Sequence, residues 1–512
     1  MSDAPESSEV VLAADGTSLK KSLNRALRRQ KLRALALIAP LLLFILITFV
    51  APIFDMLLRS VQNDIVPNTI PRTVLALQDW DETSGEAPGE EVYAQFYTDL
   101  VIAEEYKLHT RLGSRLNYEQ TGISSLFRAT GRAVGRFDTD IYVDQFEAVD
   151  PSFADPAAWG AWMQDDAVRA ALPLTADAYD AWAQMMIDDD KDPLDRDVAD
   201  FVYTAFYRDL AAGNAATALP PVDVSGFETV SVKDQFIDAK DGWADPEVWT
   251  TIKSFSGYYT TGYFLNSVDM QNTPEGVEQR PENERIYVKL FIRTIVLSLT
   301  ITGTCILLGY PIAYLLASLP MRTSSILMIL VLLPFWTSLL VRTSAWKVLL
   351  QSQGVINDTL VWVGLVADDN RLELINNMTG TIIAMTHILL PFMILPLYSV
   401  MKTISPSYVR AAKSMGATDW TAFWRVYFPN SVPGIGAGSI LVFILAIGYY
   451  ITPELVGGTN GVFISNRIAY HISSSLNWGL AAALGAILLA LVLALYWLYD
   501  RMVGIDNVKL GG

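Results

Sequence analysis

The sequence predicts an all-α membrane protein with six membrane-spanning helices and a mostly helical soluble insert between the first and the second. Hydrophobic residues make up 52% of the 512 residues and the mean hydropathy is positive, which favours a membrane protein over a soluble one. Charge is divided unevenly. Residues 61–282 carry 40 acidic and 15 basic side chains, a net charge of −25, and the rest of the chain has a net charge of +8. Two regions of opposite charge indicate two compartments.

Residues 1–33 form a basic tail ahead of the first predicted span, 34–58. The tail ends in a cluster of cations: Lys20, Lys21, Arg25, Arg28, Arg29, Lys31 and Arg33. The apolar run that follows is near the roughly 20 residues needed to cross a bilayer and too long for a typical signal peptide. The positive-inside rule therefore predicts an uncleaved first span with a cytoplasmic amino end. Nucleic-acid binding also fits the charge of the tail, but topology explains it with fewer assumptions.

The predicted acidic insert, 61–282, is large enough for a core of its own. Segment 92–100 reads VYAQFYTDL, and segment 202–210 reads VYTAFYRDL. A duplicated helical unit is one interpretation of this similarity. The acidic run 188–197 resembles a calcium loop in composition but lacks the Gly and the final Glu of an EF-hand, so a solvated loop is preferred.

Five further spans are predicted within a core at 286–502, at about 294–316, 325–341, 379–400, 434–452 and 480–498. An even total places both chain ends on one side of the membrane. The loop 402–430 then faces the cytoplasm with its four cations, as does the tail 503–512, and the acidic insert faces outward. Charge and span count agree on this topology.

The loop region 405–429 predicts two short helices joined by a glycine. Ser405 can cap the first helix, and Gly416 falls where a left-handed C-cap is expected. Tyr408, Ala412 and Met415 share one apolar face. The second helix is expected to end at Pro429 because proline interrupts helices. A small amphipathic projection between spans suits docking into the groove of a partner.

This loop resembles the EAA loop of importer-type ABC transporter permeases, which runs Glu-Ala-Ala, three residues, Gly, nine residues, Ile, any residue, Leu-Pro. The alanines, the glycine and the proline match in register, and Arg410 stands where the family has Glu. The resemblance implies that the loop docks onto an ATPase subunit. The residues it assigns to this coupling loop are Arg410, Ala411, Ala412, Met415, Gly416, Val426 and Pro429.

Four further segments are similar to PotB-type permeases of spermidine/putrescine importers: LGYP at 308–311, LPFWT at 333–337, LLPFM at 389–393 and LVGG at 455–458. The resemblance implies a multi-pass protein of the bacterial inner membrane with both termini in the cytoplasm. It also implies four partners, namely a second permease subunit in a heterodimer, two ATP-binding subunits and a periplasmic solute-binding protein. The long insert is not part of the usual pattern, where this connection is much shorter.

The chemistry of the chain argues against an enzyme. A phosphate-binding loop of the form GxxxxGK[ST] does not occur in the sequence, so ATP hydrolysis is expected in a partner subunit. The chain has one cysteine and three separated histidines, and we therefore expect no metal site and no cofactor. No catalytic residues are assigned.

A polyamine needs carboxylates for its ammonium groups and aromatic faces for cation–π contacts, each worth roughly 0.5–2 kcal/mol. Acids near spans are rare because they are costly in a membrane. Glu454 follows the predicted fifth span and is the expected ammonium partner, with Trp336, Tyr449 and Tyr450 as aromatic walls. Interfacial anchoring explains Trp and Tyr at such positions equally well.

Two alternatives remain at the level of sequence. The same machinery could carry another small organic solute, such as an opine or an amino-acid-like compound. The chain could instead be a membrane-anchored receptor or scaffold whose functional part is the acidic domain. The coupling-loop pattern disfavours the second alternative, because an anchor does not need a capped docking helix.

Overall fold

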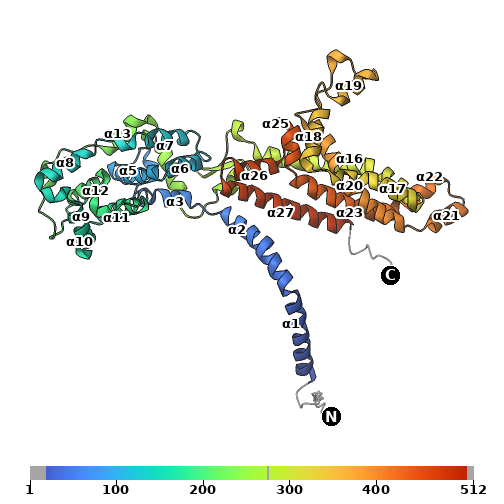
Figure 1. Ribbon diagram of the computed structural model, residues 1–512, viewed down its shortest axis with the longest axis horizontal. Helices are drawn as coiled ribbons and strands as arrows, with labels where there is room; N and C mark the ends of the chain where they lie inside the picture. The colour runs from blue at the N-terminus through green and yellow to red at the C-terminus, as the bar shows by residue number, and fades with distance from the viewer. Residues whose placement is uncertain (1–18, 274–275, 504–512) are drawn as a thin grey trace, which may run out of the picture. The chain divides into compact units, whose positions relative to one another are not determined.

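The computed structural model describes residues 19–273 and 276–503, and it is helical almost throughout (Figure 1). The chain divides into two units, Met1–Arg59 and Ser60–Gly512. The described part of the first unit is one helical run made of α1 (Leu19–Ile45), a π-helical turn η1 (Leu46–Val50) and α2 (Ala51–Arg59). Its segment Gln30–Arg59 is long and apolar enough to cross a membrane, as expected for the predicted span 34–58. Residues 1–18 and 504–512 of the two predicted tails lie outside the described residues.

The second unit begins with the insert, which is a bundle of short helices followed by one β-hairpin. Its elements are α3 (Ile65–Thr69), α4 (Pro71–Ala76), η2 (Glu82–Ser84), α5 (Glu90–Glu105), α6 (Leu108–Leu116), α7 (Ile123–Gly131), η3 (Val134–Arg136), α8 (Asp140–Val149), η4 (Pro151–Ala154), α9 (Pro156–Met163), α10 (Asp166–Ala171), α11 (Pro173–Asp188), η5 (Pro193–Asp195), α12 (Asp200–Ala211), η6 (Val224–Gly226), α13 (Val232–Ala239), η7 (Asp241–Ala244), α14 (Pro246–Ser254), α15 (Gly262–Ser267), β1 (Met270–Thr273), β2 (Gly276–Gln279) and η8 (Glu282–Glu284). The expected mostly helical insert is therefore confirmed.

The two similar segments of the insert form α5 and α12, and the structure gives them the same contacts. The Tyr93 hydroxyl donates to the carbonyl of Trp243 at 2.5 Å, and the Tyr203 hydroxyl donates to the carbonyl of Phe153 at 2.5 Å. These carbonyls belong to a second pair of similar segments, 234–249 (DQFIDAKDGWADPEVW) and 144–159 (DQFEAVDPSFADPAAW). We did not detect this second pair from the sequence, although its DQF and ADPxxW letters are visible there.

Each pair of segments contributes to both halves of the insert. Helix α5, early in the insert, packs against α13 and η7, which belong to the later segment 234–249. Helix α12, late in the insert, packs against α8 and η4, which belong to the earlier segment 144–159. The ring contacts match as well. Phe96 meets Trp249 at 5.3 Å and 80°, and Phe206 meets Trp159 at 5.5 Å and 79°. These paired contacts support an internal duplication of the insert.

The membrane core follows the insert. Its elements are α16 (Tyr287–Ser318), α17 (Met321–Leu332), η9 (Leu333–Trp336), α18 (Leu339–Leu349), α19 (Val355–Trp362), η10 (Asp368–Asn370), α20 (Met378–Thr403), α21 (Pro406–Ser414), α22 (Asp419–Ala422), η11 (Phe423–Tyr427), α23 (Phe428–Gly448), α24 (Ile451–Val456), α25 (Gly458–Gly461), α26 (Ile464–Ser473) and α27 (Trp478–Val503). Helices α16, α20 and α23 pack against one another at its centre (Figure 1). A Cβ atom at Gly438 of α23 would lie 2.6 Å from the Met393 sulfur of α20, so glycine permits this close approach.

Among the described residues, five helices are long and apolar enough to cross a membrane, and a bent pair raises the number to six. The bent pair corrects the bounds of the span expected at about 325–341. Segments Met321–Trp336 and Leu339–Leu349 meet at 94°. The bend has local causes, because Pro334 lies in the 3₁₀ turn η9 and Ser338 caps α18 by accepting from the Val341 N–H at 3.2 Å.

A second correction concerns Pro429, which was expected to end the second loop helix. The helix instead continues from Asp419 to Gly448, so residues 434–448 of the predicted span 434–452 are the C-terminal part of a longer helix, and residues 449–452 lie beyond its end. The π-helical turn η11 accommodates the proline: Phe428 donates to the carbonyl of Phe423, five residues earlier. The Asn430 side chain then donates to the carbonyl of Val426 at 2.6 Å.

Candidate functional site

The coupling-loop candidate is a capped helix–turn–helix at one end of the membrane core. The Ser405 hydroxyl accepts from the Ser407 N–H at 3.4 Å, with Pro406 in the first turn of α21. Gly416 has φ = +90° and its N–H donates to the carbonyl of Lys413 at 3.0 Å. The Thr418 hydroxyl caps α22 by accepting from the Thr421 N–H at 3.2 Å. The Ser405 cap and the left-handed glycine predicted from the sequence are therefore confirmed.

An ion pair between Lys413 of α21 and Asp419 of α22 crosses the glycine turn. Both side chains are largely exposed, so the pair adds little stability and its effect falls with salt. Below the turn, the Phe423 ring packs edge-on against Tyr310 and Tyr314 of α16 at 6.2 Å and 5.8 Å. The loop is thus joined to the longest helix of the core by aromatic contacts.

Large apolar side chains project from this loop. Tyr408, Met415, Trp420 and Trp424 are 56%, 83%, 72% and 44% exposed, and we call these four residues the loop patch. The predicted apolar face of α21 is therefore only partly covered: Ala412 is buried and the other two members are not. The remaining positions assigned to the loop differ in exposure. Arg410, Ala411, Gly416 and Pro429 are exposed, and Val426 is half-buried.

The second candidate region lies where α23 ends and α24 begins. Glu454 lies in the first turn of α24 and is exposed; its N–H donates to the carbonyl of Tyr450 at 3.0 Å, and Tyr450 is 46% exposed. Tyr449 is half-buried against the core, and its carbonyl accepts from the Ser465 hydroxyl at 2.7 Å. Trp336 is 75% exposed at the bend between α17 and α18. In the described part of the chain, neither the hydrogen bonds nor the ring contacts connect it to Glu454.

Sequence reasoning missed Asn466, which organises this region. The Asn466 amide donates to a Glu454 carboxylate oxygen at 2.6 Å and to the carbonyl of Tyr450 at 2.8 Å, and its oxygen accepts from the Phe463 N–H at 3.0 Å. It is 6% exposed. In the sequence, a polar residue at the start of a short helix indicates only a helix cap, and nothing there predicts a contact between Asn466 and Glu454.

His387 is bonded to a neighbouring helix. The Trp346 indole of α18 donates to His387 Nδ1 of α20 at 3.0 Å, which requires an unprotonated Nδ1. In the parts of the chain that the structure describes, no group of three or more His, Cys, Asp or Glu side chains could hold a metal ion. Cys305 is buried.

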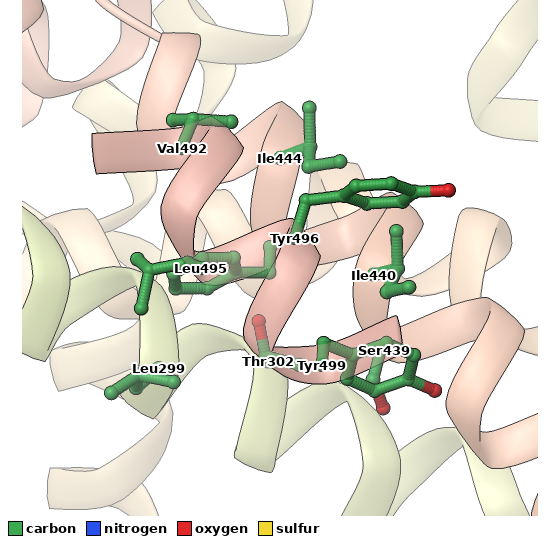
Figure 2. A pocket seen from close by; sticks show the side chains of 10 residues that line it. Leu299, Thr302, Ser439, Ile440, Ile444, Val492, Leu495, Tyr496 and Tyr499 are labelled. Atoms are coloured by element: carbon green, nitrogen blue, oxygen red, sulfur yellow. The ribbon is translucent and has the colours of Figure 1, made fainter. Parts of the chain in front are cut away.

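A cavity of about 190 Å³ lies between α16, α23 and α27, and Figure 2 shows its lining. The side chains are apolar apart from the hydroxyls of Thr302, Ser439, Tyr496 and Tyr499. None of the lining residues carries a carboxylate, which makes this cavity unsuitable for an ammonium group.

The bundle of apolar helices, with a capped loop at the end opposite the insert, defines a membrane permease. Residues 306–503 match the family described as "Binding-protein-dependent transport system inner membrane component". The chain belongs to this family of ABC transporter permeases, and it is a multi-pass inner-membrane protein. Such permeases are not enzymes themselves, and the family assignment removes the alternative of an anchored receptor or scaffold.

Among its relatives are spermidine/putrescine transport system permease proteins PotB. The chain is 33% identical to the Salmonella typhimurium (strain SL1344) protein over 221 residues, covering 43% of this chain and 76% of the relative. It is 33% identical to the Escherichia coli (strain K12) protein over 221 residues, covering 43% and 80%. The inner membrane ABC transporter permease protein YdcU of Escherichia coli (strain K12) is 30% identical over 264 residues, covering 49% and 82%.

Among solved structures, the chain is similar to a bacterial alginate ABC transporter in complex with an alginate pentasaccharide-bound periplasmic protein. The identity is 20% and the TM-score 0.37, covering 44% of this chain and 81% of that one. The family match lies within the membrane core, and the insert lies outside it.

Proposed function

We propose that the chain is the permease subunit of a polyamine importer, carrying a spermidine- or putrescine-like cation across the inner membrane. The observation that carries this proposal is the 33% identity to PotB permeases over 221 residues, which cover 76–80% of those proteins. Glu454 offers an exposed carboxylate four residues after Tyr450, which is also exposed. A carboxylate with an adjacent aromatic face is the pairing that a primary ammonium group favours.

We propose Glu454 as the ammonium partner and Tyr450 as the aromatic wall, with Tyr449 behind it. We propose that Trp336 lines a different part of the substrate path from Glu454, because it lies at the bend between α17 and α18. The main rival keeps the transport machinery and changes the cargo to an opine or an amino-acid-like compound. A zwitterionic cargo would require a cation beside the carboxylate to pair with its own acid group.

Energy would come from two ATP-binding subunits that dock on the loop patch. Tyr408, Met415, Trp420 and Trp424 present apolar and aromatic surface around a capped, glycine-jointed helix, and Arg410 adds a cation at its edge. Aromatic and Met side chains with Arg are the composition of protein-docking surfaces. Arg410 stands where the family loop has an acid, so the contact made at this position would be with an acidic residue of the partner.

The length of α16 supports the proposal that the insert and the 405–429 loop lie on opposite sides of the membrane. The insert contacts the first turn of this helix, because Asp269 accepts from the N–H groups of Tyr287 and Val288 at 2.9 Å each. The 405–429 loop contacts the other half through Tyr310 and Tyr314. A helix of 32 residues is about 48 Å long, enough to cross the membrane. With the loop in the cytoplasm, the insert is periplasmic.

In this orientation both termini are cytoplasmic, and a second permease completes a heterodimer. A periplasmic solute-binding protein would deliver the cargo, and we propose that the acidic insert serves it as a docking or accessory surface. The net charge of −25 would also concentrate polycations near the entrance, an effect that salt weakens.

Uptake of labelled spermidine and putrescine tests the cargo in cells that carry the complete transporter. E454Q should raise the KM for polyamine roughly tenfold, because a charge-assisted contact is lost. E373Q removes an exposed acid of the 342–378 segment and serves as the matched control. Unchanged kinetics in E454Q would remove Glu454 from the path, and uptake of an amino-acid-like solute without polyamine uptake would overturn the cargo.

A further inference from the structure

Helix α26 connects the insert to the Glu454 region. It is ten residues long, and both of its ends are fixed by hydrogen bonds to other elements. Asn466 and His471 are the side chains that make these bonds, and they are 6% and 3% exposed. Five residues of α-helix separate them by about 7.5 Å along the axis. The helix is therefore a short rigid link between two buried polar contacts.

At its first turn, α26 is bonded to the proposed transport path. Asn466 donates to the Glu454 carboxylate at 2.6 Å and to the carbonyl of Tyr450 at 2.8 Å. The next contact is with α16, because the Ile464 N–H donates to the Thr294 hydroxyl at 2.9 Å. Glu454 is exposed, and among the described residues the hydrogen bond that restricts its rotamer comes from Asn466.

At its last turn, α26 is bonded to α16 and packs against the insert. His471 Nε2 lies 3.0 Å from the Tyr287 hydroxyl, and His471 Nδ1 lies 2.8 Å from the Ser475 hydroxyl. The hydroxyl of Tyr118, from the insert between α6 and α7, also bonds to Ser475. The Tyr118 ring packs edge-on against His471 with centroids 5.8 Å apart.

On the insert side of the contact between Tyr118 and His471, the neighbouring side chains are held rigidly. Arg115 and Glu119 flank Tyr118 in a buried ion pair at 2.7 Å, and the Arg115 guanidinium lies 4.4 Å from the centre of the Tyr263 ring. Tyr263 in turn packs so closely on Gly479 of α27 that a Cβ atom there would lie 2.3 Å from the ring. A movement of the insert against the core would therefore be passed to α26.

We propose that Asn466 is a positioning residue for Glu454, and that α26 is the element through which the insert sets that position. The proposal rests on the proposed role of Glu454 for its effect on transport, and on the geometry alone for its structural part. A partner that binds the insert would then change the orientation of the carboxylate that receives the cargo.

Hydrogen–deuterium exchange of the full chain in lipid nanodiscs tests the structural part and needs no cargo. Y118A should speed amide exchange in α26 and in residues 449–456, well beyond the insert. S473A is the control, since Ser473 is exposed and its hydroxyl bonds locally, to the carbonyl of Ala469 in its own helix and to the neighbouring Ser474 hydroxyl. An increase confined to the insert would overturn the link. If Y118A also speeds exchange in α5 and α12, the whole insert is destabilised, and Y118F is measured instead. Y118F keeps the ring and removes the hydroxyl that bonds to Ser475. Faster exchange in α26 and in residues 449–456 would again support the link, and an increase confined to the insert would overturn it.

Uptake kinetics test the positioning role. N466D keeps the oxygen that accepts from the Phe463 N–H but places a carboxylate against Glu454, so the helix cap survives and the positioning bond does not. We expect a rise in KM of about tenfold, with Vmax and subunit assembly retained. A KM equal to that of S473A would overturn the role. Failure of polyamine uptake in the unmodified protein would reject the cargo, and the exchange experiment would still decide the link.

Discussion

Asp99 and Asp209 accept the same pair of hydrogen bonds in the two halves of the insert. One carboxylate oxygen of Asp99 accepts from the Thr73 N–H at 2.8 Å and from its hydroxyl at 2.7 Å; Asp209 does the same with Thr175 at 2.8 Å and 2.7 Å. Both aspartates are buried, and both threonines lie in the first turn of a helix that begins with proline. The duplication thus repeats a buried polar contact as well as an aromatic core.

Equivalent substitutions at these two sites should have equivalent effects. T73V and T175V each remove the hydroxyl donor and keep the N–H, so each should destabilise its half by about 1 kcal/mol. Amide exchange of α5 and α12 in the full chain measures the two losses separately. Loss of protection in both helices from either single variant would show that the halves unfold together, and a several-fold difference in size would argue against equivalence.

Gly416 should be required for its backbone conformation. With φ = +90°, an alanine there is strained by about 1–2 kcal/mol even though space is open around it. We expect G416A to weaken co-purification with ATPase subunits and G416N to weaken it less, because Asn tolerates left-handed geometry. G303A is the control: Gly303 lies in α16 at negative φ with nothing within 4 Å of an added Cβ. Equal assembly of G416A and G303A would contradict the prediction.

The loop patch should be needed for assembly but not for folding. W420A and M415S shorten side chains that are 72% and 83% exposed, so the thermal midpoint of the isolated chain should change little. Co-purification of ATPase subunits should fall at least tenfold in the double variant, as expected for loss of an aromatic anchor. W362A removes an indole that is 86% exposed on α19, away from the loop, and should assemble normally.

His471 should make the free energy of unfolding of the chain depend on pH. Burial, with a smaller effect of nearby Arg467, lowers the pKa of His471 from 6.5 to about 4. The unfolded chain therefore takes up a proton between pH 6.5 and 4 that the folded chain does not. The stabilising contribution is present above pH 6.5 and is lost as the pH falls, at up to about 1.4 kcal/mol per pH unit.

The measurement for His471 is the thermal midpoint of the full chain against pH, compared with H471F. The comparison is necessary because the many carboxylates of the insert titrate in the same range. The difference between the two proteins should shrink from pH 6.5 to pH 4 and stay constant above pH 7. A difference that does not change with pH would mean that His471 is not buried in its neutral form.

The sequence alone determined the helical class and the capped glycine turn of the 405–429 loop. These features depend on local physics: apolar runs of membrane length, caps such as Ser405 and Thr418, and a residue such as Gly416 that tolerates positive φ. The sequence did not determine whether a helix bends or continues at a given proline. Pro334 marks a bend of 94°, whereas Pro429 is absorbed by a π-helical turn, and the difference depends on the neighbouring hydrogen bonds.

Only the tertiary structure decided which residues meet across the chain. Asn466 reads as an ordinary cap until the fold places Glu454 within 2.6 Å of its amide. Tyr118 reads as one aromatic residue among many until it packs on His471. The second similar pair of segments in the insert became evident through Trp243 and Phe153, which the fold sets against α5 and α12. Sequence patterns report the local preferences of a segment, whereas such contacts depend on how segments far apart in the chain pack together.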